Sequence, residues 1–293
     1  MVVPKKSLGQ HWLKDRAILT NIAAYANIEG NTVLEIGPGL GFLTSVLLTK
    51  AAKVVAVEYD AELARKLPAS FPGKNLEVVN ADFLQYDLSQ LPSGYKVVAN
   101  VPYYITSKIV QKLLTANNKP SEIVLLVQKE VAERLAAGPG ELSILGISAQ
   151  VYADVELGEV VPARLFTPPP KVDSQVVVIR PFALCKGHPC KTHPCKTSPF
   201  ARVTLAKPLA GSSKDAGTDA EKNTEREFFK LVKVGFSSPR KKVVSNLANG
   251  LHKDRTEVEA WFDELKLDRN LRAQDLSIAD WIDLLHKAEP RKG

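Results

Sequence analysis

Residues 32–41 read Thr-Val-Leu-Glu-Ile-Gly-Pro-Gly-Leu-Gly, an apolar run that passes directly into a glycine-rich turn. A short apolar run that ends in turn residues is typical of a buried strand. The glycines that follow, among them Gly37 and Gly39, allow the backbone to approach a ligand closely. Residues 42–48 predict a helix, whose N-terminus would place partial positive charge beside the turn. This strand, turn and helix indicate an α/β domain.

Six further apolar runs predict the other strands of the sheet, and most are separated by stretches with helical periodicity. The predicted strands lie at 53–58, 76–80, 96–99, 122–127, 147–155 and 175–179. The predicted helices of this part of the chain lie at 15–26, 107–114 and 129–136. Strands that alternate with helices favour a parallel sheet covered by helices.

Glycine or polar residues stand at the ends of the first four predicted strands: Gly37, Glu58, Asp82 and Asn100. Ligands of open parallel sheets bind outside the carboxyl ends of the strands, where a carboxylate such as Glu58 accepts the hydroxyls of a ribose. Asp82 is suited to accept the amine of an adenine, and the ring of Phe83 to pack against that base. Together these residues predict a nucleotide-like cofactor.

A nicotinamide-dependent dehydrogenase is an alternative that uses a similar cofactor. Its dinucleotide pattern is Gly-x-Gly-x-x-Gly, whereas this chain has glycines at 37, 39 and 41. No residue stands out as a partner in hydride transfer, so the dehydrogenase interpretation is weakened.

The stretch Asn100-Val101-Pro102-Tyr103 follows the predicted strand at 96–99. Pro102 cannot donate to a sheet and holds Val101 in an extended conformation. The Asn100 side-chain oxygen and the Val101 carbonyl can therefore accept two hydrogen bonds from one exocyclic amine, while Tyr103 stacks on the ring that carries it. An Asx-turn with packed tyrosines is the simpler alternative.

Phe166 opens the proline-rich stretch 166–174. A stiff loop could hold this ring near Asn100 as a second aromatic face for the base. A position in the hydrophobic core fits the sequence equally well, and both interpretations stay open.

The net charge of +7 over 293 residues is unevenly distributed. Residues 1–16, with Lys5 and Lys6, carry +3, residues 185–224 carry +4, and residues 225–293 carry +2. The remaining residues carry −2, which fits a near-neutral pocket with basic flanks that contact phosphates. No apolar run is long enough to span a bilayer and no signal peptide is recognisable, so a cytoplasmic location is expected.

Residues 185–224 interrupt the α/β pattern. His-Pro-Cys-Lys-Thr at 188–192 is repeated directly at 193–197, and all three cysteines of the chain lie in this segment. A metal site is conceivable here, but the paired CxxC spacing of zinc knuckles is missing, so we expect no metal and a mobile basic insertion. The predicted domains are thus 1–184, the insertion 185–224, and 225–293.

Helical periodicity returns in the last domain. Helices are predicted at 228–236, 240–247, 257–265 and 278–287, with Ser238, Thr256 and Ser277 as N-caps and Pro239 at a first helical position. Arg240, Lys241 and Lys242 would then stand in a first turn, where cations are unfavourable for the helix dipole. Such a placement favours contact with phosphates.

Four motifs together resemble the ribosomal RNA adenine N6-dimethyltransferases, most closely the KsgA type that acts on small-subunit RNA. They are Gly-Gln-His-Trp-Leu at 9–13, Leu-Glu-Ile-Gly-Pro-Gly-Leu-Gly at 34–41, Asn-Val-Pro-Tyr-Tyr at 100–104 and Pro-Pro-Lys-Val-Asp-Ser at 169–174. The similarity extends to 128–132 and 235–237, and covers nearly the whole chain outside 185–224.

The resemblance implies a Rossmann-like, seven-stranded S-adenosylmethionine-dependent methyltransferase domain followed by a small all-helical, RNA-binding domain. It also implies that S-adenosylmethionine contacts His11, Leu13, Gly37, Glu58, Asp82 and Asn100; the family commonly has Asn at the position of His11. The implied substrate is the small ribosomal subunit and its RNA, methylated to N6,N6-dimethyladenosine by a protein expected to be monomeric.

Two alternatives share much of this pattern. A macrolide-resistance methyltransferase would act on large-subunit RNA with the same Asn-x-Pro-Tyr core, although the segment 169–174 favours the small-subunit type. A ribosome-assembly factor would bind RNA and methylate it only incidentally, although an intact set from Asn100 to Tyr103 argues for catalysis.

Overall fold

The structure is a computed structural model that describes residues 10–182 and 217–288, without the side chains of 217–222. The predicted RNA contacts Lys5 and Lys6, and the Cys- and His-containing repeat at 188–197, lie outside the described residues. The described chain divides into two compact units. One contains 10–136 and 153–181, and the other contains 137–152 and the residues after 181.

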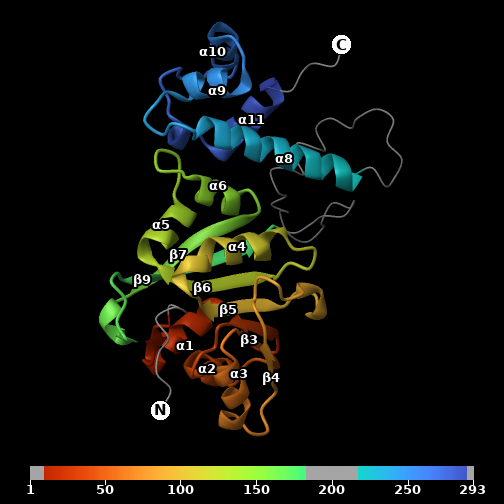
Figure 1. Ribbon diagram of the computed structural model, residues 1–293, viewed down its shortest axis with the longest axis vertical. Coiled ribbons are helices and arrows are strands. Elements are labelled where there is room, and N and C mark those ends of the chain that lie inside the picture. Colours follow the sequence, from red (N-terminus) through yellow and green to blue (C-terminus); the bar gives the residue numbers. More distant parts are fainter. Residues whose placement is uncertain (1–9, 183–216, 289–293) are drawn as a thin grey trace. The chain divides into compact units, whose positions relative to one another are not determined.

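A seven-stranded sheet forms the centre of the first unit, as predicted (Figure 1). Its order is β4-β3-β2-β5-β6-β9-β7. The strands are β2 (Thr32–Ile36), β3 (Lys53–Glu58), β4 (Leu76–Asn80), β5 (Lys96–Asn100), β6 (Glu122–Gln128), β7 (Ala153–Val161) and β9 (Ser174–Pro181). The strands from β2 to β6 are parallel, whereas β9 pairs antiparallel with both β6 and β7.

Helices bury both faces of this sheet. They are α1 (Arg16–Tyr25), α2 (Phe42–Leu47), α3 (Ala61–Lys66), α4 (Thr106–Thr115) and α5 (Lys129–Ala136). One core contains the apolar sides of α1 and α2 together with alternate strand residues such as Val98 and Val124. The intervening residues, such as Val97 and Leu125, are also fully buried, which explains why the central strands are continuous apolar runs.

The sixth predicted strand is wrong in its position. The predicted strand covered 147–155. In the structure, its first residues belong to helix α6 (Ile144–Gln150), and strand β7 begins at Ala153. The Ser143 hydroxyl accepts a hydrogen bond from the Gly146 amide at 3.1 Å and caps this helix. The N-cap serine before this apolar run is the sequence signal that indicates the helix.

A second, two-stranded sheet joins distant parts of the first unit. Strand β1 (Trp12–Leu13) pairs antiparallel with β8 (Phe166–Thr167). Leu13 and Phe166 lie opposite each other, are almost fully buried, and belong to the core over α1 and α2. The pairing fixes Trp12 and Leu13 against the segment that precedes β9.

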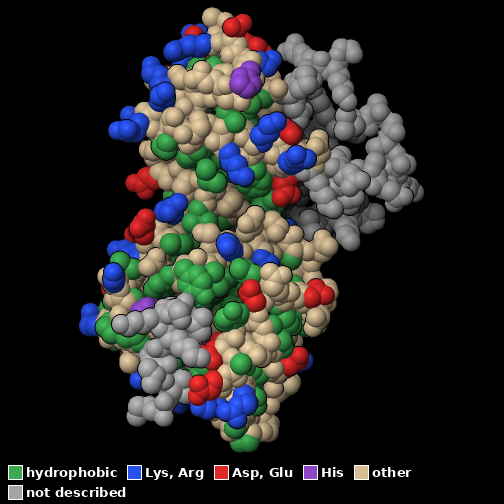
Figure 2. Space-filling model, in the orientation of Figure 1, with side chains coloured by type: hydrophobic (Ala, Val, Ile, Leu, Met, Phe, Trp, Pro, Cys, Tyr) green, Lys and Arg blue, Asp and Glu red, His purple; other side chains and the backbone are tan. Residues whose placement is uncertain are grey.

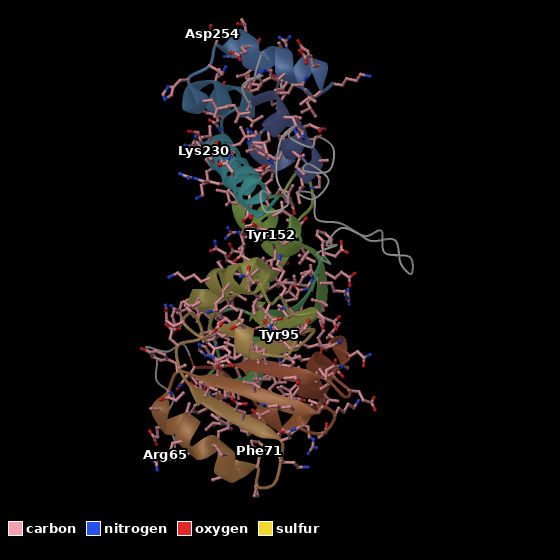
Figure 3. The ribbon with its side chains drawn as sticks, turned by 90° about the vertical axis from the view of Figure 1, so that its right-hand side faces the viewer. Arg65, Phe71, Tyr95, Tyr152, Lys230 and Asp254 are labelled. Atoms are coloured by element: carbon pink, nitrogen blue, oxygen red, sulfur yellow. The ribbon has the colours of Figure 1, made fainter. Side chains whose placement is uncertain are left out.

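The second unit is helical, as predicted. It contains α6, α8 (Gly217–Gly235), α9 (Val243–Leu251), α10 (Arg255–Glu264) and α11 (Ile278–Ala288). Helix α8 packs on α9 and α11 around Phe228 and Trp281, which are both fully buried. Figure 2 shows Lys and Arg side chains over the visible face of this unit, and Figure 3 labels Lys230 on α8.

Segment 137–152 belongs to this second unit, although the predicted domains assigned it to the first. The Gly140 amide donates to the Gln274 carbonyl at 2.9 Å, and the Gln274 side chain donates back to the Gly140 carbonyl at 2.8 Å. Tyr152, labelled in Figure 3, donates its hydroxyl to the Glu225 carboxylate. These contacts join residues far apart in the sequence, so composition alone does not reveal them.

The predicted start of the helix at 240 is also wrong. Ser238 accepts a backbone hydrogen bond from Lys241 in a turn, and α9 begins at Val243 with Lys242 as its N-cap. Arg240 and Lys241 therefore precede the helix instead of occupying its first turn. The Lys242 ammonium donates to the Asn270 side-chain oxygen at 2.5 Å. The argument from an unfavourable helix dipole consequently does not apply to these cations.

Gly235 and Gly138 offer a matched test of packing in the second unit. A Cβ on Gly235 would lie 2.2 Å from Trp281 Cη2, whereas a Cβ on Gly138 would meet nothing within 4 Å. Because Trp281 is fully buried and cannot move aside, we expect Gly235→Ala to lower the free energy of unfolding by about 1–3 kcal/mol. Urea denaturation of both variants measures this, and equal midpoints would contradict the packing.

No helix within 10–182 or 217–288 is long and apolar enough to cross a membrane.

Candidate active site

A pocket of about 340 Å³ lies at the carboxyl ends of β2, β3 and β5 and beside the turn after β4. In the strand order, β3 and β4 lie on one side of β2, and β5 lies on the other. Ligands of open α/β sheets bind where the order reverses in this way. The pocket contains the following residues predicted from the sequence: His11, Leu13, Gly37, Gly39, Glu58, Asp82, Phe83, Asn100, Val101, Pro102 and Tyr103.

The glycine turn after β2 is tied to the end of β3 by Glu58. Gly37, Gly39 and Gly41 all have positive φ, of 68°, 58° and 84°. The Gly39 amide donates to Glu58 Oε2 at 3.0 Å, and the Asp60 amide donates to Oε1 at 2.8 Å. Because two carboxylate oxygens offer about four acceptor sites, Glu58 can accept further hydrogen bonds from ribose hydroxyls.

Close packing explains why the turn requires glycine. A Cβ on Gly39 would lie 3.1 Å from the Trp12 indole nitrogen. A Cβ on Gly41 would lie 2.7 Å from Leu67 Cδ1 and 2.9 Å from Phe71 Cε2, and Phe71 is labelled in Figure 3. The turn is therefore enclosed on both sides, and its free face is directed to the pocket.

Glu35 is a second buried carboxyl group in the pocket, and the sequence interpretation did not include it. It is 1% exposed and accepts a hydrogen bond from the Thr44 hydroxyl at 2.7 Å. Burial raises the pKa of Glu35 to about 8, and the nearby Glu58 adds to this. Burial also raises the pKa of Glu58, against the hydrogen bonds from Asp60 and Gly39. A positively charged ligand beside these two carboxyls would lower their pKa values and favour the ionised forms.

Glu35 gives a prediction for the pH dependence of stability. The group ionises near 4.5 in the unfolded chain and near 8 in the folded protein. Between these values the folded protein binds more protons, so the stability due to Glu35 is complete below the lower value and lost as the pH rises through the upper one. Relative to the wild type, Glu35→Gln should therefore gain stability between pH 5 and about pH 8. Urea unfolding of the free proteins across this range measures it, and a constant difference would contradict the prediction.

The turn after β4 carries Asp82 and Phe83, and Lys112 of α4 braces it. The Lys112 ammonium donates to the carbonyls of Leu84 at 2.9 Å and Tyr86 at 2.6 Å, and lies 5.5 Å from the centre of the Phe83 ring. Partial burial lowers the pKa of Lys112. Nothing in the sequence pattern indicated that Lys112, on a helix about thirty residues after this turn, supports it.

We expect Lys112→Met to raise the Kd of the cofactor by about 10-fold, because lost hydrogen bonds from a charged group leave the turn at Asp82 and Phe83 unsupported. Lys108→Met is the matched control, since Lys108 is an exposed lysine on the same helix. Isothermal calorimetry with the cofactor measures the effect. Equal Kd values for both variants would exclude the bracing role.

The turn after β5 presents Asn100, Val101 and Tyr103 to the pocket. The Asn100 side-chain nitrogen donates to the His11 carbonyl at 3.2 Å, which leaves the side-chain oxygen as the acceptor for a ligand. The Tyr103 ring stacks on the His11 ring, and its hydroxyl lies 2.7 Å from the Ser174 hydroxyl. Burial raises the pKa of Tyr103. The phenol is therefore a fixed, neutral stacking surface.

The pocket mouth carries two exposed tyrosines. Tyr59, which follows β3, is 63% exposed, and Tyr104, which follows Tyr103, is 64% exposed. They are the most exposed large apolar side chains of the described residues. Such rings at a pocket rim are suited to stacking on planar ligands.

Phe166 is a correction to the predicted site. It is not among the residues that line the pocket, and its ring is 3% exposed within the core between the sheet and α1. The core alternative for Phe166 is therefore the correct one. The predicted contacts Arg240, Lys241 and Lys242 belong to the second compact unit.

Comparison with known proteins identifies the family. A family model described as "Ribosomal RNA adenine dimethylase" matches residues 3–185. A relative named "Ribosomal RNA small subunit methyltransferase A" from Acaryochloris marina is 38% identical over 299 residues, which cover 98% of both chains. A relative of the same name from Dehalococcoides mccartyi (strain CBDB1) is 34% identical over 94% of this chain and 86% of its own.

Two solved structures are similar over nearly the whole chain. One is the 23S rRNA methyltransferase ErmE, with a TM-score of 0.67 and 27% identity over 94% of this chain and 98% of its own. The other is a dimethyladenosine transferase from Plasmodium falciparum, with a TM-score of 0.67 and 25% identity over 94% and 96%. The pocket geometry, the family model and the full-length relatives agree: the chain belongs to the ribosomal RNA adenine dimethylase family.

Proposed function

We propose that the protein transfers methyl groups from S-adenosylmethionine to N6 of adenines in small-subunit ribosomal RNA during ribosome biogenesis. One observation carries the proposal. The acceptors Asn100 and Val101 and the stacking ring of Tyr103 share a single pocket with the glycine turn and Glu58. A site for an aromatic amine therefore adjoins a site for a nucleotide-like methyl donor.

The residues of the pocket fit the donor. The turn at Gly37 and Gly39 has no side chain where the donor's amino-acid part would pass, and Glu58 has acceptor sites for its ribose hydroxyls. Asp82 and Phe83 would contact its adenine. When bound, S-adenosylmethionine supplies a methyl group on a positively charged sulfur, and that charge would favour the ionised forms of the buried carboxyls Glu35 and Glu58.

The turn after β5 activates the target base by positioning it. The lone pair of adenine N6 is delocalised into the ring, which makes the amine a poor nucleophile. When the Asn100 side-chain oxygen and the Val101 carbonyl accept its two N–H groups, they favour a pyramidal nitrogen whose lone pair is directed away from both acceptors. Tyr103 stacks on the base after its extrusion from the RNA.

No strong base is required, because the proton leaves N6 only after the nitrogen has become positively charged. Positioning of two reactants in this way is worth roughly 7–11 kcal/mol of the barrier. After the first transfer one N–H group remains on N6, and one acceptor is enough to orient it. Two successive transfers give N6,N6-dimethyladenosine.

The wider setting is part of the proposal. Lys5, Lys6, Arg240, Lys241 and Lys242 would contact RNA phosphates, since basic groups outside a near-neutral pocket are suited to grip the backbone. The protein would act in the cytoplasm as a monomer on the small ribosomal subunit.

The large-subunit alternative rests on the likeness to ErmE, at 27% identity. The relatives named for the small subunit reach 38% identity over 98% of both chains, which favours small-subunit RNA. An assembly factor with incidental methylation is compatible with RNA binding, but it would not need the Asn100 acceptor in the pocket.

Transfer of labelled methyl groups to a panel of RNAs tests the proposed substrate. The panel contains unmethylated small subunits, large subunits and the naked RNA of each. Label on small-subunit RNA alone is expected. Label confined to large-subunit RNA would move the protein to the resistance class, and cofactor binding without any transfer would leave only the assembly-factor alternative.

A further inference from the structure

Tyr103 is held in place by two side chains that come from distant parts of the chain. The His11 ring stacks on the Tyr103 ring, with centroids 5.9 Å apart and planes 15° apart. On its other end, the Tyr103 hydroxyl lies 2.7 Å from the Ser174 hydroxyl. The ring plane and the phenol oxygen are therefore both fixed before any base arrives.

His11 is itself anchored from two directions. Its Nδ1 lies 2.7 Å from the Pro168 carbonyl oxygen, so Nδ1 carries a proton and donates it. Its own carbonyl accepts from the Asn100 side chain at 3.2 Å. The adjacent pairing of Trp12 with Thr167 holds both partners in register. His11 thus links the acceptor Asn100 to the stacking ring Tyr103.

Ser174 supplies the rigid end of the arrangement. It is the first residue of β9, is completely buried, and lies opposite Gln128 of β6 and Val161 of β7. A buried hydroxyl is costly unless it is hydrogen-bonded, and Tyr103 provides the partner. Because two neighbouring strands hold Ser174, its hydroxyl sets a fixed position for the phenol oxygen.

We propose that His11 and Ser174 are positioning residues for the target base, acting through Tyr103. This inference rests on the proposed function. The His11 side chain then serves the substrate side of the pocket, and does so by its ring and its Nδ1–H group instead of by contact with the cofactor. Release of either contact lets the Tyr103 ring tilt, and the stacked base loses its alignment with the methyl donor.

Four variants separate the contacts. Ser174→Ala and Tyr103→Phe each remove one half of the hydroxyl pair. His11→Phe keeps a ring for stacking but removes the bond to Pro168, and His11→Ala removes both. Ser121→Ala is the matched control, because its hydroxyl bonds to the Gly94 carbonyl at 2.8 Å before β6, away from the pocket.

The measurements are single-turnover methyl transfer to small subunits, the Kd of the cofactor, and the melting temperature. We expect Ser174→Ala and Tyr103→Phe each to slow transfer by about 10-fold, and the double variant to be no slower than either, because both remove one contact. His11→Phe should be intermediate between the wild type and His11→Ala. In all of these variants the cofactor Kd should stay within about 2-fold of the wild-type value.

Three results would overturn the inference. They are wild-type transfer rates in Ser174→Ala, additive losses in the double variant, or a cofactor Kd in His11→Ala that rises by the same factor as the rate falls. A general loss of structure is recognised by a lowered melting temperature together with weaker cofactor binding, and it would likewise assign these residues a structural role. If the wild-type protein methylates no RNA, the proposed function itself is contradicted, and not only the role of His11 and Ser174.

Discussion

Replacement of Asn100 with alanine is expected to slow methyl transfer by about 10³-fold, because it removes a fixed acceptor that orients and polarises the target amine. The Val101 carbonyl alone cannot hold both N–H groups of N6. The variant also loses the bond from its side chain to the His11 carbonyl, which loosens the same side of the pocket. Single-turnover transfer at saturating cofactor measures the loss.

Cofactor binding is the internal control for this variant. The glycine turn and Glu58 are tied to each other by the Gly39 amide and not by Asn100. The cofactor Kd of Asn100→Ala should therefore change by no more than about 5-fold. A rate within 10-fold of the wild type would show that Asn100 does not orient the amine, and a Kd that accounts for the whole loss would assign it to the cofactor alone.

Replacement of Glu58 with alanine is expected to raise the cofactor Kd by about 100-fold. The carboxylate provides the acceptors for a ribose and also receives the amides of Gly39 and Asp60. Hydrogen bonds to a charged group are worth about 1.5–3 kcal/mol, and 1.4 kcal/mol corresponds to about 10-fold in Kd. Calorimetric titration with S-adenosylmethionine measures the change.

Glu77→Ala is the matched control for Glu58. It removes a carboxylate of the same charge from the adjacent strand β4, where Glu77 is exposed and pairs with Lys53. Its cofactor Kd should remain that of the wild type. If both variants bind the cofactor equally well, Glu58 has no direct role in the ribose site.

The sheet and the pocket were predictable because local patterns coincide with tertiary arrangement there. Strands β2, β3, β5 and β6 are buried on both faces, so each reads as a short apolar run. The edge strand β4 is only partly buried. Parallel strands bring their carboxyl ends to one edge, and for that reason Glu58, Asp82 and Asn100 meet in one pocket.

The rest depends on contacts between distant residues. Phe166 is buried because β8 pairs with β1. A strand of only two residues is too short to be recognised from its sequence pattern. The braces Lys112 and Ser174 act on turns that lie far away in the sequence. Strand β7 was misplaced because the first part of the apolar run at 147–155 belongs to the capped helix α6. For Phe166, Lys112 and Ser174 tertiary contacts override the local pattern, whereas the helix before β7 has a local signal in its N-cap, Ser143.

Glu35 shows a different limit. It stands within the apolar run that predicts β2, and a carboxyl in such a run is unusual. The sequence therefore contained a signal, but only the structure shows that Glu35 lines the pocket beside Glu58 and bonds to Thr44.

The most direct test of the account is a nucleoside analysis of its product. Unmethylated small subunits are treated with S-adenosylmethionine and either the wild type or Asn100→Ala, and their RNA is digested and separated by mass. The account predicts N6,N6-dimethyladenosine with the wild type and almost none with the variant. Methyl groups on any atom other than adenine N6, or equal dimethyladenosine from both proteins, would contradict the role of the Asn100 turn.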